Sequence, residues 1–82
     1  MPDPNQVRDA ARQVVAEMTG KKLKDGDSLI SSGLIDSLSI LKLISRLETR
    51  LSVSIPPDNL QPDDFENVDY IVDTVLRVAG EP

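Results

Sequence analysis

Apolar residues recur along this chain at intervals of three and four, separated by charged and polar residues. This spacing places the apolar side chains on one face of a helix, where other helices can bury them. It predicts helices at about residues 4–19, 37–51, 62–66 and 68–79, the third of them short. The positions expected to be buried are Val7, Ala10, Ala11, Val14, Val15 and Met18; Ile40, Leu43, Ile44, Leu47 and Leu51, with Leu41 at the edge; and Val68, Ile71, Val72, Val75, Leu76 and Ala79.

The residues at the ends of these segments agree with the spacing. Asp3, Asp36 and Asn67 each precede a predicted helix, and their side chains can accept hydrogen bonds from backbone N–H groups of its first turn. Gly20 follows the first helix, where a glycine commonly ends one. We therefore expect an all-α fold, a small four-helix bundle with three longer helices and one short helix, formed by a single domain over residues 1–82.

The connection between the first two helices, residues 21–36, is longer than most loops in compact domains. Asp27 or Ser28 can cap a single helical turn at residues 29–31. Apolar side chains are expected to hold the loop against the core: Leu23, Leu29, Ile30, Leu34 and Ile35. The side of the first helix expected to face water carries Arg8, Asp9, Arg12, Gln13 and Glu17.

The stretch Gly33-Leu34-Ile35-Asp36-Ser37-Leu38-Ser39 brings a serine to the start of the second helix. Ser37 is the first helical residue after the cap, where backbone N–H groups lack helical partners and the helix dipole is positive. A phosphate group on its hydroxyl would be stabilised there. Serine is also an ordinary residue at the start of a helix, so the pair Asp-Ser alone does not separate the two interpretations.

The order of motifs is more specific than the pair. With Asp27-Ser28-Leu29, then Leu34-Ile35-Asp36-Ser37-Leu38, then a leucine-rich helix, the chain resembles the acyl carrier protein family of the free-standing bacterial type over nearly its whole length. Members of that family are small four-helix domains that carry 4′-phosphopantetheine on the serine of an Asp-Ser-Leu motif. The resemblance implies that Ser37 receives this group from coenzyme A, beside the motif acid Asp36. It also implies that partner enzymes contact Leu38.

The resemblance further implies a role and a set of partners. The thiol of the arm would hold an acyl or aminoacyl group as a thioester, in fatty acid, polyketide or aminoacyl biosynthesis. The expected partners are a phosphopantetheinyl transferase, a loading ligase for the acyl or aminoacyl group and the enzymes that process it. Free-standing aminoacyl carriers, such as the D-alanyl type, are similar in overall plan.

The second helix departs from the pattern of fatty-acid carriers, which usually have acidic residues there. Lys42, Arg46 and Arg50 recur at every fourth position, and Leu38 projects onto the same polar side. A solvated face would explain these residues, but beside Ser37 we interpret them as a partner-docking surface. Because charge complementarity governs which partners dock, a dedicated loading ligase is favoured over a general fatty-acid role.

The composition of the chain argues against several other classes of function. The chain of 82 residues has no histidine and no cysteine, so it lacks the usual base and nucleophile of acyl transfer, and we expect no enzyme activity of its own. Its formal charge of −5 argues against nucleic acid as a partner. The apolar runs are too short to insert into a membrane, and the first residues do not open a signal peptide. We expect a cytoplasmic monomer.

Two acidic stretches could suggest a metal site. The segment Asp25-Gly26-Asp27-Ser28 does not complete a calcium loop, because Leu29 and Ile30 occupy positions where a ligand and a turning glycine are needed. A second group of acidic residues lies near the start of the short helix and of the last helix, where the positive end of the helix dipole stabilises negative charge without a metal ion. These residues are Asp63, Asp64, Glu66 and Asp69. We therefore expect no metal ligands.

Two hypotheses compete with the carrier. The first is a non-catalytic helical adaptor that binds a partner through Leu38 and the basic positions of the second helix. The second is a regulatory domain phosphorylated on Ser37. All three use the same exposed end of the second helix.

Overall fold

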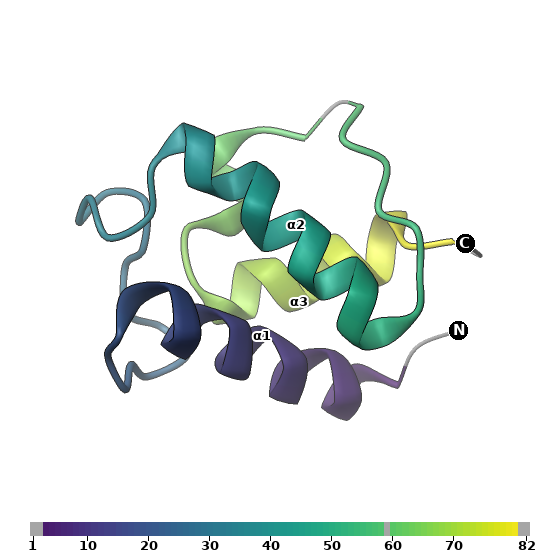
Figure 1. The fold of residues 1–82 in the computed structure, drawn as a ribbon, viewed down its shortest axis with the longest axis horizontal. Helices are drawn as coiled ribbons and strands as arrows, with labels where there is room; N and C mark the ends of the chain where they lie inside the picture. The colour runs from purple at the N-terminus through teal and green to yellow at the C-terminus, as the bar shows by residue number, and fades with distance from the viewer. Residues whose placement is uncertain (1–2, 59, 81–82) are drawn as a thin grey trace.

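The fold is all-α, as the apolar spacing predicts. The computed structural model describes residues 3–58 and 60–80, and its elements are α1 (Pro4–Thr19), α2 (Ser37–Leu51), the short 3-10 helix η1 (Pro62–Phe65) and α3 (Val68–Val78) (Figure 1). The predicted domain also includes Met1, Pro2, Asn59, Glu81 and Pro82, which lie outside the described residues.

The two C-terminal elements end earlier than predicted. The N–H of Glu66 donates to the carbonyl of Asp63, three residues earlier, so η1 is a 3-10 helix that ends at Phe65. Helix α3 ends at Val78 because Ala79 is extended. Gly80 then pairs with Ser54 through two backbone hydrogen bonds of 2.9 Å, which tie the end of the chain to the segment after α2.

The caps expected from the sequence are formed. The side chains of Asp3, Asp36 and Asn67 accept hydrogen bonds from the N–H groups of Asn5, Ser39 and Tyr70, at 2.9, 2.8 and 2.9 Å. Gly20 has φ +71°, the left-handed conformation that ends α1 without the steric cost of a side chain. These caps set where each helix begins and where α1 ends.

Helix α1 lies against both α2 and α3, while η1 bridges α2 and α3 (Figure 1). The buried face of each helix is close to the expected one, with Met18, Leu51, Leu76 and Ala79 half-buried at the edge of the core. The core consists of Val7, Ala10, Ala11, Val14, Val15, Leu29, Ile35, Ile40, Leu43, Ile44, Leu47, Ile55, Phe65, Val68, Ile71, Val72 and Val75.

The long loop between α1 and α2 closes one end of the bundle, at the left in Figure 1. Leu29 and Ile35 are buried, whereas Leu23, Ile30 and Leu34 are half-buried. The expected turn at residues 29–31 lies one position later, where the N–H of Gly33 donates to the carbonyl of Ile30 at 3.0 Å. Of the two candidate caps, Ser28 serves it by accepting from the N–H of Ser32, and Asp27 binds the N–H of Lys24 instead.

Candidate functional site

The start of α2 presents Ser37 to solvent. Asp36 is extended and caps the helix, and Ser37 is the first helical residue and is exposed. Hydrogen bonds from the backbone N–H of Ser39, and then from its hydroxyl, lower the pKa of Asp36, so this carboxylate is charged at neutral pH. The hydroxyl of Ser37 therefore stands at the positive end of a helix with its cap already formed, as the sequence predicts.

Two apolar side chains lie exposed just after Ser37. Leu38 is 83% exposed, in agreement with its predicted place on the polar side of the helix. Leu41 is 62% exposed, so the expectation that it borders the buried face is wrong. The buried face of α2 consists of Ile40, Leu43, Ile44 and Leu47, and Leu41 lies outside it. The surface beside Ser37 is thus more apolar than the sequence predicts.

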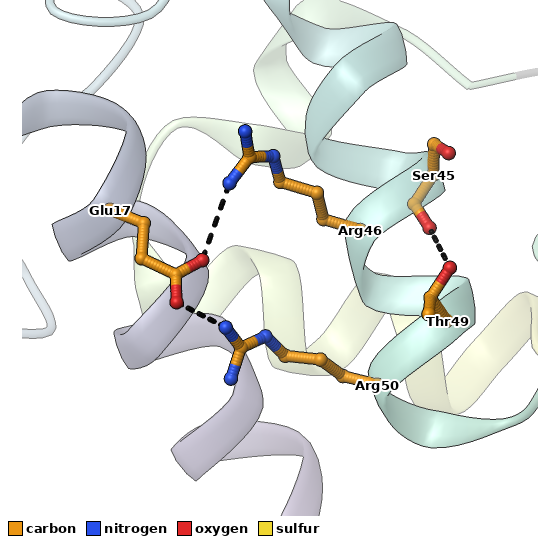
Figure 2. Close-up of a pocket in the computed structure, with 5 residues that line it drawn as sticks. All are labelled: Glu17, Ser45, Arg46, Thr49 and Arg50. Carbon is orange, nitrogen blue, oxygen red and sulfur yellow. Dashed lines mark hydrogen bonds and ion pairs between the residues drawn. The ribbon is translucent and has the colours of Figure 1, made fainter.

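The basic residues of α2 do not share one environment. Arg46 and Arg50 reach across to α1, where both bind the carboxylate of Glu17, Arg46 at 3.3 Å (Figure 2). Arg50 also donates to the side-chain oxygen of Gln13. Lys42 is exposed one turn closer to Ser37. Gln13 and Glu17 are exposed, as expected, and they also fasten α1 to α2.

These two arginines border an open hollow between α1 and α2. Its volume is about 330 Å³, and its lining residues are Glu17, Ser45, Arg46, Thr49 and Arg50 (Figure 2). The hydroxyl of Thr49 donates a hydrogen bond to the carbonyl of Ser45 at 3.1 Å, and the two guanidinium groups form ion pairs with Glu17. Two positive charges meet one negative charge, so the hollow carries a net positive charge of one.

A second ion-pair network ties the start of the long loop to the helices. Asp25 accepts from Arg8 at 2.7 Å and from two nitrogens of Arg12 at 2.8 and 2.9 Å, and Arg8 also binds Asp69 of α3 at 2.6 Å. The Arg12 hydrogen bonds, followed by those of Arg8, lower the pKa of Asp25 to about 2. Arg12 is exposed, as expected, whereas Arg8 is half-buried, and both hold the loop.

Glu66 binds the later part of the same loop. Its carboxylate accepts hydrogen bonds from the hydroxyls of Ser28 and Ser31 and from the N–H groups of Ile30 and Ser31. The Ser28 and then the Ser31 hydroxyl lower the pKa of Glu66 to about 2. Two other acidic residues near η1 and α3 also bind groups of the protein: Asp64 accepts from the N–H of Gln61 at 2.9 Å, and Asp69 accepts from Arg8 at 2.6 Å. Over residues 3–58 and 60–80, no group of three or more His, Cys, Asp or Glu side chains is placed to hold a metal ion.

Comparison with known proteins shows the family to which the chain belongs. A family model described as phosphopantetheine attachment site matches residues 9–80. The chain belongs to this family. Its members are carriers rather than catalysts: they hold a 4′-phosphopantetheine group and present acyl or aminoacyl groups on it. Carriers of this kind are modified by phosphopantetheinyl transferases and meet the enzymes that load them.

Two curated relatives are D-alanyl carrier proteins from two strains of Lactobacillus delbrueckii subsp. bulgaricus. Each is 26% identical to this chain over 70 residues, which cover 83% of this chain and 88% of the relative. The match therefore spans the region of the long loop, Ser37 and α2.

Among the helices in the described part of this carrier, none has the length and apolarity that crossing a membrane would require.

The sequence signals for the residues around Ser37 are local, whereas those for the residues that hold the long loop in place are not. Asp36, Ser37 and Leu38 are consecutive in the chain. The predicted cap at Asp36 and the predicted exposure of Ser37 and Leu38 are confirmed. The binding of Glu66 to the long loop was missed, because its partners lie 35 or more positions away. A clue was available in the three serines at positions 28, 31 and 32, whose hydroxyls and neighbouring amides need acceptors in a loop this long.

Proposed function

We propose that Ser37 is the residue on which this carrier holds its 4′-phosphopantetheine group. The observation that supports it most is the exposed hydroxyl at the first position of α2, after a cap that Asp36 forms with the N–H of Ser39 at 2.8 Å. Because Asp36 occupies the cap, the hydroxyl of Ser37 is not needed to complete the helix and can be modified without loss of that hydrogen bond. A phosphate diester at this end of a helix is also favoured by the dipole.

The chemistry asks little of the carrier itself. Ser37 Oγ forms a bond to the phosphorus of the phosphopantetheine half of coenzyme A, while the bond between that phosphorus and the oxygen of the 3′,5′-ADP half breaks. The hydroxyl proton passes to a base of the transferase, because the carrier has no histidine and the hydrogen bonds from Ser39 lower the pKa of the adjacent Asp36, which makes it a weak base. The bound arm supplies a terminal thiol for thioester formation, and the carrier supplies the tether that raises its local concentration at each partner.

The docking surface that we propose includes Leu38, Lys42, Arg46 and Arg50. Leu38 and the neighbouring Leu41 are the largest exposed apolar side chains of α2 and lie within four residues of Ser37. Lys42 adds one positive charge to this surface. Arg46 and Arg50 pair with the single carboxylate of Glu17, so together these three side chains add one more net positive charge. Aromatic or aliphatic anchors surrounded by charges are typical of protein interfaces, so the partner surface is expected to be apolar at its centre and acidic at its rim.

For the cargo, we propose an acyl or aminoacyl group delivered by a dedicated ligase. The basic residues of α2 support a partner set different from that of acidic fatty-acid carriers, and the curated relatives are D-alanyl carrier proteins. The carrier would act as a monomer in the cytoplasm, where coenzyme A is available and a chain without cysteine needs no oxidising environment. D-alanine is therefore the first amino acid to offer to candidate ligases.

The attachment is tested by intact mass after incubation with coenzyme A, magnesium and a broad-specificity phosphopantetheinyl transferase. The native chain is expected to gain the mass of one arm, and Ser37→Ala is expected to gain none. Ser39→Ala removes the nearest other hydroxyl of α2 and is the matched control, expected to be modified. If neither the native chain nor Ser39→Ala gains the arm, attachment at Ser37 is contradicted and the adaptor hypothesis remains standing.

The docking surface is tested by the rate at which a ligase loads the modified carrier. Leu38→Ala and Lys42→Glu are each expected to raise the KM for the carrier. Arg77→Glu makes the same charge change on α3, where the arginine is exposed, and is expected to leave the KM unchanged. Equal effects of Lys42→Glu and Arg77→Glu would show that net charge, not this surface, controls loading.

A further inference from the structure

Glu66 accepts five hydrogen bonds from the loop that leads into Ser37. Its Oε1 accepts from the hydroxyl of Ser28 at 2.6 Å and from the N–H groups of Ile30 and Ser31 at 3.2 and 3.1 Å. Its Oε2 accepts from the hydroxyl of Ser31, and its backbone carbonyl accepts from the N–H of Leu29 at 2.6 Å. One residue between η1 and α3 thus binds four consecutive residues of the long loop.

The charge of Glu66 strengthens this attachment. The hydroxyl donors lower its pKa to about 2, so the carboxylate is ionised throughout the neutral range. Hydrogen bonds to an ionised acceptor are stronger than those between neutral groups, and this acceptor gathers four of them. The side chain is half-buried against the loop.

The bound segment is connected directly to the start of α2. The carbonyl of Leu29 accepts from the N–H of Ile35 at 2.9 Å, and the side chains of both residues are buried. Ile35 immediately precedes the cap Asp36 and therefore the serine after it. The position of Ser37 relative to the bundle thus depends on where Glu66 holds residues 28–31.

We propose that Glu66 is a positioning residue for arm attachment, holding residues 28–35 so that Ser37 is presented in the orientation that the transferase requires. This rests on the proposed function, in which Ser37 is the residue modified. Glu66 does not touch the reacting atoms and acts through the loop. Asp25 fastens an earlier part of the same loop to Arg8 and Arg12, so it offers a comparison at a similar kind of attachment.

Loss of Glu66 has a distinct kinetic consequence. A loosened loop presents Ser37 correctly for a fraction of the time, and the apparent affinity falls by that fraction. The KM for the carrier therefore rises, while kcat stays near its native value once the complex has formed. A loss of global stability alone leaves both constants unchanged as long as the carrier stays folded at the assay temperature.

The experiment measures transferase kinetics with coenzyme A for the native chain, Glu66→Ala, Glu66→Gln and Asp25→Asn, each checked for folding by circular dichroism. Glu66→Ala is expected to raise the KM about tenfold with kcat retained. Glu66→Gln keeps one oxygen acceptor at the same reach but loses the charge and the second acceptor, so its KM is expected to lie between those of the native chain and Glu66→Ala. Asp25→Asn is expected to stay within about twofold of the native KM.

Hydrogen exchange supplies a second measurement on the same samples. The amides of Leu29, Ile30 and Ser31 are expected to exchange faster in Glu66→Ala than in Asp25→Asn. If Glu66→Ala does not fold, the double variant Ser28→Ala, Ser31→Ala removes the hydroxyl donors while leaving the carboxylate. It is expected to raise the KM in the same direction.

The outcomes separate this proposal from the function on which it rests. A KM in Glu66→Ala, or in the double serine variant, no higher than that in Asp25→Asn overturns the positioning role while leaving Ser37 as the modified residue. Faster exchange at residues 29–31 without a change in KM overturns it as well. A native chain that gains no arm, or gains it equally in Ser37→Ala, overturns the proposed function itself.

Discussion

Replacing Asp25 by asparagine tests how much of the fold depends on one charged residue of the long loop. The carboxylate accepts from Arg8 at 2.7 Å and from Arg12 at 2.8 and 2.9 Å. Asparagine keeps the size of the side chain and one acceptor oxygen but removes the charge. The substitution therefore isolates the ionic part of the attachment from its packing.

The size of the effect follows from the pKa of Asp25, which the two arginines lower from 3.8 to about 2. At about 1.4 kcal/mol per pKa unit, this difference sets an upper limit of roughly 2.5 kcal/mol. The side chains of Arg8 and Arg12 are 32% and 51% exposed, so solvent screens much of that energy. We expect Asp25→Asn to lower the free energy of unfolding by about 1 kcal/mol at neutral pH, or Tm by about 5 °C.

The pH dependence has a definite sign. Because the pKa of Asp25 is lower in the folded state, its contribution is complete above the unfolded value of 3.8 and is lost as the pH falls toward 2. Urea denaturation followed by circular dichroism should show the difference between native and variant chains shrinking across that range, and shrinking also in high salt. Asp73→Asn, an exposed aspartate on α3, is the control, with an expected change within about 0.5 kcal/mol. A difference that persists below pH 2, or an equal loss in Asp73→Asn, would refute this reasoning.

Three further predictions follow from packing, backbone conformation and exposure. Leu43→Ala empties a fully buried position of α2 and is expected to cost about 2–5 kcal/mol in urea denaturation, where a loss below 1 kcal/mol would contradict its place in the core. Gly33→Ala is expected to cost about 1 kcal/mol because Gly33 has φ +80° with open space around it, whereas Gly26→Ala should be nearly neutral, and equal costs would argue against a backbone origin. Leu38→Ala is expected to leave Tm within about 2 °C of the native value, since its side chain is 83% exposed, and a larger drop would mean that Leu38 supports the fold.

The helices could be predicted from the sequence because their signals are local. Asp36 and the leucines after it lie within a few turns of one another, so capping and apolar spacing define α2 without knowledge of the rest of the chain. Leu41 shows the limit of such local signals. A helical projection places it at the border of the buried face, but it is 62% exposed, because exposure depends on how the elements pack and not on the helix alone.

The hydrogen bonds and ion pairs that hold the long loop and α2 in place could not be predicted, because they join residues distant in sequence. Glu66 binds Ser28 across 38 positions, and Arg46 and Arg50 bind Glu17 across 29 and 33. A charged residue on a helix surface or in a loop has many possible partners until the helices are packed. Periodicity reports which side of a helix is polar, and it does not report which polar groups meet there.

The central claim is that the hydroxyl of Ser37 carries the arm, and fragment mass spectrometry of the modified native chain tests it most directly. Cleavage after lysine and arginine releases residues 25–42 as one peptide, which contains Ser28, Ser31, Ser32, Ser37 and Ser39. The account predicts that this peptide bears the phosphopantetheine mass and that its fragment ions assign the mass to Ser37. Assignment to any of the other four serines, or to a different peptide, would contradict it.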